Sequence, residues 1–277
     1  MGRGASGDER YDEREAMNGL QFLLAPERVI HFMLVAARLG GVIAAAPFLG
    51  HSSIPVRLRA SLAVGAALAF AGQVPMGAAA EIEDTWALTG ALIVETAAGV
   101  MIGLVVQLIL GGIMLGGEVA GIQMGLGMSN LVDPVTKTDA TPVALWFQFL
   151  AMMVILSLDV HHLLLRALAR SLTVVPPGAL HVNAAGLGFS LGLMKELFEI
   201  AVRIAAPVLS GLLIIDTAMG LLARAFPELN VFIMGFAVKI GVGFLLMGAA
   251  LPYAIRFLEQ RLGDLDAMLM GLVRALG

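Results

Sequence analysis

Long apolar stretches, separated by short polar or proline-containing links, run through most of this chain. A bilayer is spanned by about 20 helical residues, so stretches of this kind predict membrane-associated helices. Six of them cover residues 29–46, 56–72, 85–110, 142–172, 186–226 and 231–261. Pro207 is expected to break the fifth stretch, and an amphipathic pattern over residues 264–276 predicts a short last helix. The pattern therefore predicts an all-α fold.

Composition narrows the class of protein to a membrane or membrane-assembly protein. Apolar residues make up 59% of the 277 positions and charged residues 14%. In soluble domains, apolar residues make up about half of the positions and charged residues about a quarter. The net charge is −4 without a basic cluster, so no feature indicates nucleic-acid binding. There is no cysteine, and hence no disulfide or thiolate metal site. The polar residues 1–28 do not resemble a signal peptide and are predicted to be a disordered tail, with either Met1 or Met17 as the start.

The segment of residues 111–134, GGIMLGGEVAGIQMGLGMSNLVDP, combines seven glycines with almost no charge. Each glycine costs a helix about 1 kcal/mol relative to alanine, which predicts a bent or looped backbone. Irregular backbone at membrane depth is tolerated only where protein buries it or where it lines a cavity. One interpretation is therefore a segment that lines or closes a pore. The other is that glycines spaced four residues apart form a face for close helix packing, and both remain open.

Ionisable side chains occur inside the apolar stretches, namely Glu95, Asp159, Asp216 and Lys239. Such groups have to face protein, water or one another. His161 and His162 are adjacent, so on a helix they point about 100° apart and are not the i, i+4 pair that binds one metal. No zinc-protease, nucleophile-elbow or phosphate-loop motif occurs. We therefore predict no enzyme activity, no metal and no cofactor, which leaves a secondary transporter or a subunit of a larger channel.

Four blocks of residues carry a resemblance to a known family. They are Arg38 with residues 46–49 and 54–57; residues 117–125 with Asp133 and Pro134; residues 159–167 with the break at 175–176; and residues 216–239. On these blocks the chain resembles the FliR family of flagellar and type III secretion export-gate proteins. The blocks follow one another from about residue 30 to residue 260. The resemblance therefore covers nearly the whole chain.

The resemblance implies a non-enzymatic subunit of the flagellar export gate, in the bacterial inner membrane within the basal body. The implied partners are FliP-like and FliQ-like subunits, an FlhB-like switch protein and an FlhA-like export protein, with unfolded exported proteins as cargo and lipid around the assembly. The implied fold is a set of broken helical hairpins, in which a FliP-like portion, residues 29–172, is joined by a link, residues 173–186, to a FliQ-like portion, residues 187–277. An injectisome gate is the alternative within the family. A transporter that uses Glu95, Asp159 and Asp216 is the alternative outside it.

The resemblance also places a pore plug in a loop of residues 111–130. The implied plug residues are Gly111, Gly112, Met114, Gly116, Gly117, Glu118, Gly121, Ile122, Gln123, Met124, Gly125 and Met128. Glycine would allow the loop its conformations and Met and Ile would seal it against ions, while Glu118 is expected to anchor it through a backbone donor or a partner. A second set is expected to serve structural pairing and assembly: Arg38, Pro47, Pro55, Arg57, Asp133, Pro134, Asp159, Asp216, Arg224, Pro227, Asn230 and Lys239.

Overall fold

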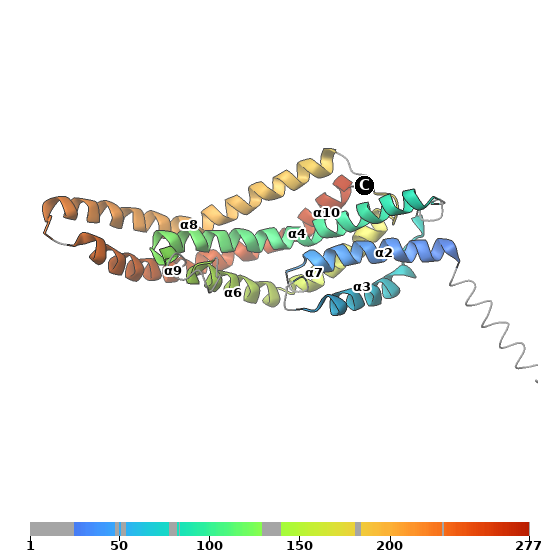
Figure 1. Ribbon diagram of the computed structural model, residues 1–277, viewed down its shortest axis with the longest axis horizontal. Coiled ribbons are helices and arrows are strands. Elements are labelled where there is room, and N and C mark those ends of the chain that lie inside the picture. Colours follow the sequence, from blue (N-terminus) through green and yellow to red (C-terminus); the bar gives the residue numbers. More distant parts are fainter. Residues whose placement is uncertain are drawn as a thin grey trace, which may run out of the picture. The chain divides into compact units, whose positions relative to one another are not determined.

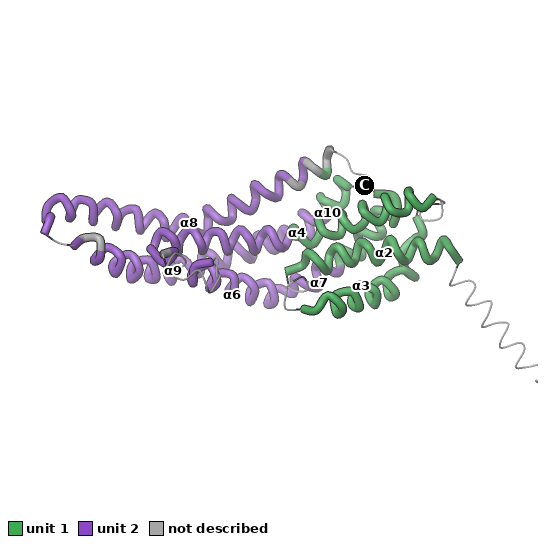
Figure 2. Tube along the Cα trace, in the orientation of Figure 1, with its two compact units in different colours: residues 1–104, 166–186, 270–277 green, residues 105–165, 187–269 purple. Residues whose placement is uncertain are grey.

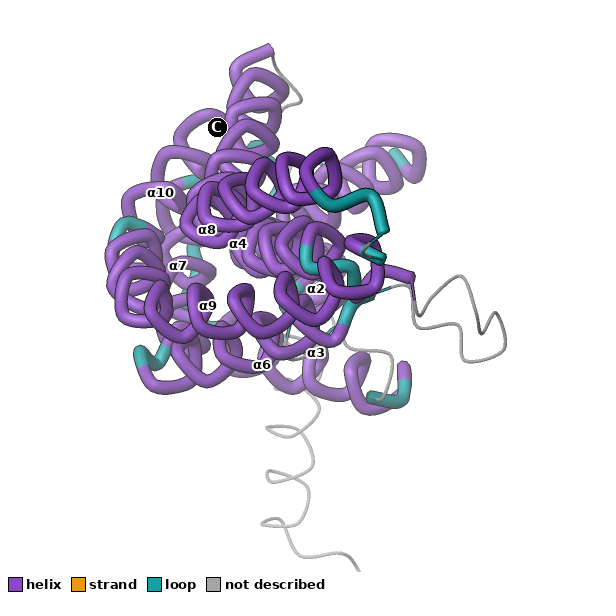
Figure 3. The backbone as a smooth tube through the Cα atoms, turned by 90° about the vertical axis from the view of Figure 1, so that its left-hand side faces the viewer, coloured by secondary structure: helices purple, strands orange, loops and turns teal. Residues whose placement is uncertain are grey.

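The computed structural model describes residues 25–47, 50, 54–77, 82, 84–128, 140–180, 184–228 and 230–276. These residues form helices joined by loops, with no strand among them (Figure 3). The six long stretches correspond to α2 (Pro26–Ala45), α3 (Val56–Ala71), α4 (Thr85–Gln123), the pair α6 (Pro142–Ser157) and α7 (Val160–Val174), α8 (Ala184–Ala225) and α9 (Val231–Gly263) (Figure 1). The short helix α10 (Leu265–Leu276) ends the chain, and the 3-10 turn η2 (Leu126–Met128) follows α4. The predicted all-α fold is confirmed.

Several helices are long and apolar enough to cross a membrane. Within the described residues these are Pro26–Ala45, Thr85–Gln123, Leu191–Ala225 and Ile233–Leu276. The pair α6 and α7 would add a fifth span, although its axis bends by 64° at the break between the two helices. The fold is therefore that of an all-α membrane protein.

Packing divides the chain into two compact units, each assembled from stretches that are distant in sequence (Figure 2). As far as they are described, residues 1–104, 166–186 and 270–277 form unit 1, and residues 105–165 and 187–269 form unit 2. Helices α4, α7 and α10 each contribute to both units, as does α8 through its first three residues. The predicted FliP-like and FliQ-like portions are each continuous in sequence, whereas each packing unit combines separate stretches. The division into these two portions stays a prediction.

In unit 1, α2 packs against α3 and crosses α4 at glycines. The buried face of α2 recurs every three or four residues, at His31, Leu34, Val35, Arg38, Leu39 and Val42. Gly41 and Gly99 lie where α2 and α4 touch, and a Cβ on Gly99 would stand 3.0 Å from the backbone nitrogen of Val42. Because this crossing brings the two backbones together, Arg38 and Glu95, one turn before these glycines, can meet in the core.

In unit 2, the second half of α4 packs against α6 and α8, again through glycines. Gly112 and Gly116 face α8, where an added Cβ would stand 2.7 and 2.8 Å from backbone carbonyl oxygens. Gly117 faces α6, where a Cβ would stand 2.9 Å from the Cα of Ala144. Helices α4, α6, α8 and α9 meet around a small apolar cavity of about 20 Å³. The glycine contacts show that α4 approaches α6 and α8 closely at the backbone in the core of unit 2.

The prediction of a loop over residues 111–130 is wrong for residues 111–123, because α4 continues through Gln123. The helical cost of the glycines is offset by the close approach to α6 and α8 that they permit. The packing-face interpretation of these glycines is thus the one that the structure supports. A turn at residues 124–125 follows the helix, and Gly125 in it has a φ of 88° that disfavours other residues. Residues 129–130 lie outside the described residues.

Three further boundaries differ from the sequence-based expectation. Residues 26–28, assigned to the polar tail, are the first turn of α2, which Pro26 opens. Pro207 does not end its helix, because α8 is continuous across it and buries Ile204 and Val208 on either side. The fourth stretch is instead the one that breaks, at Asp159, which has a φ of 51°. Packing contacts on both sides of Pro207 hold the helix that proline alone would interrupt.

Candidate functional site

The described residues that follow α4, residues 124–128, are here called the post-α4 segment, and its first two residues lie against α9. Met124 is fully buried, and its side chain lies against Gly243 of α9, where an added Cβ would stand 2.6 Å from the Met124 Cγ. The ring of Phe236, also from α9, occupies the space where a Cβ on Gly125 would stand. Two positions without a Cβ, one on each partner, therefore allow this close contact.

A polar cluster joins the end of α4 to the same pair of helices. Gln123, the last residue of α4, donates from Nε2 to Asp216 Oδ2 of α8 at 2.9 Å. The other oxygen of Asp216 forms an ion pair with Lys239 of α9. The side chains of Asp216 and Lys239 are 31% and 25% exposed. Charged groups within apolar segments are costly unless paired, so this ion pair accounts for both charges and also fixes Gln123.

The return of the chain into α6 is anchored on α4 as well. Glu118 Oε2 accepts a hydrogen bond from the backbone N–H of Thr141 at 2.7 Å. Thr141 is fully buried, and its hydroxyl accepts from the backbone N–H of Ala144 as the N-cap of α6. Gly121 leaves the space for the Thr141 side chain. The connection from α4 to α6 thus begins and ends at anchored residues.

A second polar cluster lies buried in unit 1. The Arg38 guanidinium donates to both carboxylate oxygens of Glu95, at 2.5 and 3.0 Å. It also donates to the carbonyl oxygens of Ser171 and Val175 at the end of α7, both at 2.9 Å. Glu95 in turn accepts from the backbone N–H of Gly178 at 2.8 Å. This arrangement joins α2, α4 and the end of α7. Because Glu95 is fully buried and has these partners, the structure does not favour it as an ion-coupling group.

Sequence reasoning missed a third cluster, which joins α8 to the C-terminal part of α9. Arg261 forms ion pairs with Glu196 at 2.6 Å and Glu199 at 3.0 Å. Glu199 also pairs with Arg203 at 2.7 Å, and the guanidinium groups of Arg203 and Arg261 lie 5.5 and 5.4 Å from the ring centroid of Phe257. The i, i+4 spacing of Glu199 and Arg203 is visible in the sequence. Their partner on α9 is not, because it lies far along the chain.

The other predicted assembly residues are dispersed. Pro55 precedes the first residue of α3, and the side chain of Asn230 caps α9 by accepting from the backbone N–H of Ile233. Pro47 follows α2, and Pro227 is exposed in the turn after α8. Arg57 and Arg224 are exposed, and neither forms an ion pair with a described residue. Asp133 and Pro134 lie outside the described residues. The assembly roles of these residues stay predictions.

Of the predicted plug residues, Gly112, Gly116, Gly117 and Gly121 lie on the packing faces of α4. Ile122 lies at the surface and is 57% exposed. Gly125 and Met124 are the members that meet α9, while Glu118 and Gln123 supply the polar anchors. The functional residues that sequence reasoning missed are the partners of these groups, Thr141, Phe236 and Gly243. Phe236 lies within the fourth block of the family resemblance, whereas Thr141 and Gly243 gave a signal only by type, as a helix-capping threonine and a glycine in an apolar helix.

The fold and these clusters define a class, the polytopic α-helical membrane proteins whose intramembrane charges are paired with one another. A family model of bacterial export proteins, family 1, matches residues 29–265. The flagellar biosynthetic protein FliR of Caulobacter vibrioides is 30% identical over 219 residues, which are 79% of this chain and 87% of that protein. FliR of Bacillus subtilis is 27% identical over 78% of this chain and 84% of that protein. FliR of Escherichia coli K12 is 28% identical over 86% and 91%.

The chain belongs to the FliR family of bacterial export proteins. Members of this family are membrane components of the flagellar export apparatus, which agrees with the apolar helices of the present fold.

Proposed function

We propose that the chain is a non-enzymatic core subunit of the flagellar type III export gate. It forms the channel for unfolded axial proteins together with FliP-like and FliQ-like subunits, in the inner membrane within the basal body. FlhB-like and FlhA-like proteins are its further neighbours in the apparatus. Family membership supports the export role. The antiparallel hairpin of α8 and α9, within residues 187–277, supports a FliQ-like portion of the chain.

The exposed face of this hairpin favours protein neighbours. Large apolar side chains that are at least 64% exposed occur on both helices: Leu191, Val202, Leu213, Ile214, Leu221, Ile233 and Leu245. The ion pair of Asp216 and Lys239 lies among them and is about a quarter to a third exposed. A partly exposed charge pair is costly against lipid tails but is readily covered by a polar group of another subunit. A subunit in a hetero-complex therefore accounts for this face better than an isolated transporter does.

The observation that carries the gating part of the proposal is the anchoring of the post-α4 segment. The plug begins at Met124 in this proposal, because residues 111–123 pack as helix. Met124, Gly125 and Gln123 hold the start of the plug on α8 and α9, and Glu118 holds its return into α6. The closed gate would be stabilised by these contacts, and passage of an exported chain would require them to separate.

Variants that weaken these anchors are expected to leak. Gly125→Ala places a side chain on a backbone with φ of 88° and against Phe236, and Asp216→Asn weakens the contacts to Lys239 and Gln123. Glu118→Gln weakens the hold on Thr141. In planar bilayers containing the purified complex of this chain with its FliP-like and FliQ-like partners, each variant should raise the resting ion conductance above that of the wild type.

The matched control is Glu259→Gln, which neutralises an exposed carboxylate of α9 away from these anchors. It should leave the conductance unchanged. Complexes of all variants should have the same subunit composition, so that a leak reports on closure and not on assembly. Conductance equal to that of the wild type in all three anchor variants would contradict the plug, while the subunit role would stand.

A further inference from the structure

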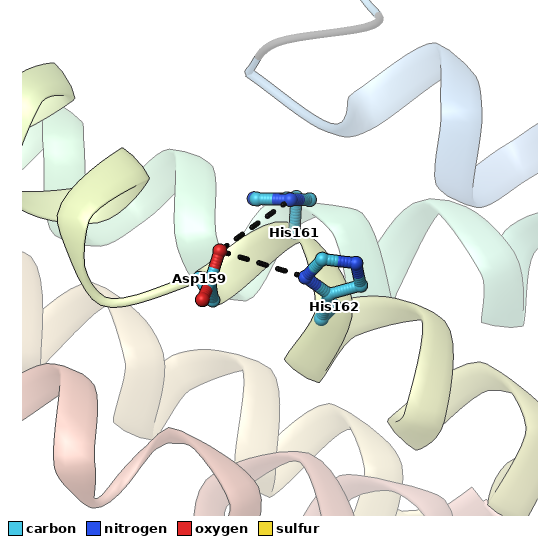
Figure 4. Close-up of side chains that lie close together, drawn as sticks. All are labelled: Asp159, His161 and His162. Carbon is cyan, nitrogen blue, oxygen red and sulfur yellow. Dashed lines mark ion pairs between the residues drawn. The ribbon is translucent and has the colours of Figure 1, made fainter.

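The break between α6 and α7 brings three potential metal ligands together (Figure 4). Asp159 lies in the break with a φ of 51°, a left-handed conformation in which aspartate is enriched. His161 and His162 follow in the first turn of α7, and Figure 4 shows the Asp159 carboxylate beside both imidazoles. One ligand atom from each of the three residues lies within 4.8 Å of the others.

The separations fit a shared ion better than direct hydrogen bonds. Asp159 Oδ1 lies 3.7 Å from His161 Nε2 and 3.6 Å from His162 Nδ1. Hydrogen bonds would bring such atoms to about 2.7–3.2 Å. Around a tetrahedral ion with bonds of about 2.0–2.2 Å, two ligand atoms stand about 3.3–3.6 Å apart. Small rotations of exposed side chains would therefore complete the geometry.

The neighbouring histidines diverge less than an ideal helix would make them. Their ring centroids are 4.2 Å apart and the ring planes are inclined by 39°. The sequence-based argument against a metal assumed two residues inside a regular helix. These two residues instead lie in the first turn of a helix directly after a break, and Asp159, two residues before His161, supplies the third ligand.

The Asp159 carboxylate is not engaged in capping α7 within the described part of the chain. The backbone N–H groups of His162 and Leu163 in the first turn of α7 donate to the backbone carbonyl oxygen of Asp159, at 2.9 and 3.3 Å. The side chain is 71% exposed, and those of His161 and His162 are 42% and 60% exposed. All three ligand groups are thus accessible to an ion from solution.

We propose that Asp159, His161 and His162 form a binding site for a divalent transition-metal ion of the Zn²⁺ class. Two imidazoles and one carboxylate suit zinc and its first-row neighbours, whereas Mg²⁺ and Ca²⁺ prefer oxygen ligands throughout. Three protein ligands leave a fourth position for water. The bound ion connects the break to the first turn of α7 and so stabilises the 64° bend between the two helices. The site is independent of the proposed gating function.

The test uses the full chain in its purified complex, isolated without a polyhistidine tag. Zn²⁺ is titrated against a chromophoric competitor, and Co²⁺ is added separately to record its visible absorption. The wild type should bind one Zn²⁺ per chain and give the intense absorption of four-coordinate Co²⁺. Asp159→Asn and His162→Gln should each weaken Zn²⁺ binding by roughly tenfold or more and abolish the Co²⁺ band. Zn²⁺ should raise the melting temperature of the wild type but not of these two variants.

The control is Asp264→Asn, an exposed aspartate at another helix junction, between α9 and α10. It should bind Zn²⁺ as the wild type does. Circular dichroism of the metal-free variants should match the wild type, because the replaced side chains are exposed. Absence of stoichiometric Zn²⁺ binding in the wild type, or equal binding by Asp159→Asn and His162→Gln, would overturn the site.

Discussion

Glu95→Gln is expected to lower the free energy of unfolding by about 3–5 kcal/mol, because it leaves the Arg38 guanidinium buried without a counter-charge. The substitution keeps the shape of the side chain, so the effect reports on charge and hydrogen bonding instead of packing. In the wild type, two donors of Arg38 and the N–H of Gly178 share the two carboxylate oxygens of Glu95. The glutamine amide has only one acceptor oxygen for these three donors. The melting temperature of the complex, followed by size-exclusion chromatography after heating, should fall by roughly 10 °C or more.

The double variant Arg38→Met/Glu95→Leu separates this explanation from a simple loss of contacts. Replacing both members of a buried pair by apolar residues is often far less harmful than removing one of them. The double variant should therefore be more stable than Glu95→Gln. Arg203→Ala is the control, because it removes a half-exposed i, i+4 partner of Glu199 and should cost about 1 kcal/mol or less. A loss for Glu95→Gln no larger than that of the control would contradict the assignment.

Gly116→Leu is expected to disrupt unit 2. A Cβ alone at this position would stand 2.8 Å from the carbonyl oxygen of Ala201 and 2.9 Å from the Cβ of Ile204, so α4 and α8 would have to separate. Overpacking of a core costs about 1–3 kcal/mol where neighbours can shift, and backbone contacts shift least. The yield of assembled complex and its resistance to protease should both fall.

The same helix offers the matched control. Gly90 lies on an exposed part of α4 with nothing within 4 Å of its Cβ position. Gly90→Leu should keep the wild-type yield, since leucine has the higher helix propensity by nearly 1 kcal/mol. If Gly116→Leu assembled as well as Gly90→Leu, the glycines of α4 would not be a packing face, and the loop interpretation of this segment would return.

The position of α4 shows what the sequence could and could not predict. Its apolar first part was predicted correctly, because hydrophobicity and length suffice there. For the glycine-rich part, helix propensity predicts a bent or looped backbone and the four-residue glycine spacing a packing face, and the family resemblance places a loop there. Neither pattern includes the gain from packing against a helix about 80 residues further on. Gly112 and Gly116 meet α8 at Leu197 and Ala201, and no local pattern indicates that contact.

The polar clusters were predictable in part. Arg38 and Glu95 are isolated opposite charges in apolar stretches, so the rule that buried charges pair indicates a partner for each. It does not indicate that they meet each other, or that Arg38 also binds the end of α7. Asp216 and Lys239 are expected to serve structural pairing because breaking a buried ion pair is costly, and the structure brings them together. Their shared partner Gln123 comes from α4 and could not be inferred from the hairpin alone.

The measurement that tests the central claim most directly is native mass spectrometry of the tagged chain, purified in mild detergent after expression with and without FliP-like and FliQ-like partners. The export-gate subunit predicts a hetero-complex that contains few copies of this chain, and poor recovery when the chain is expressed alone. A stable, monodisperse protein obtained without partners, and able to carry a small solute across vesicles, would contradict it and favour a transporter.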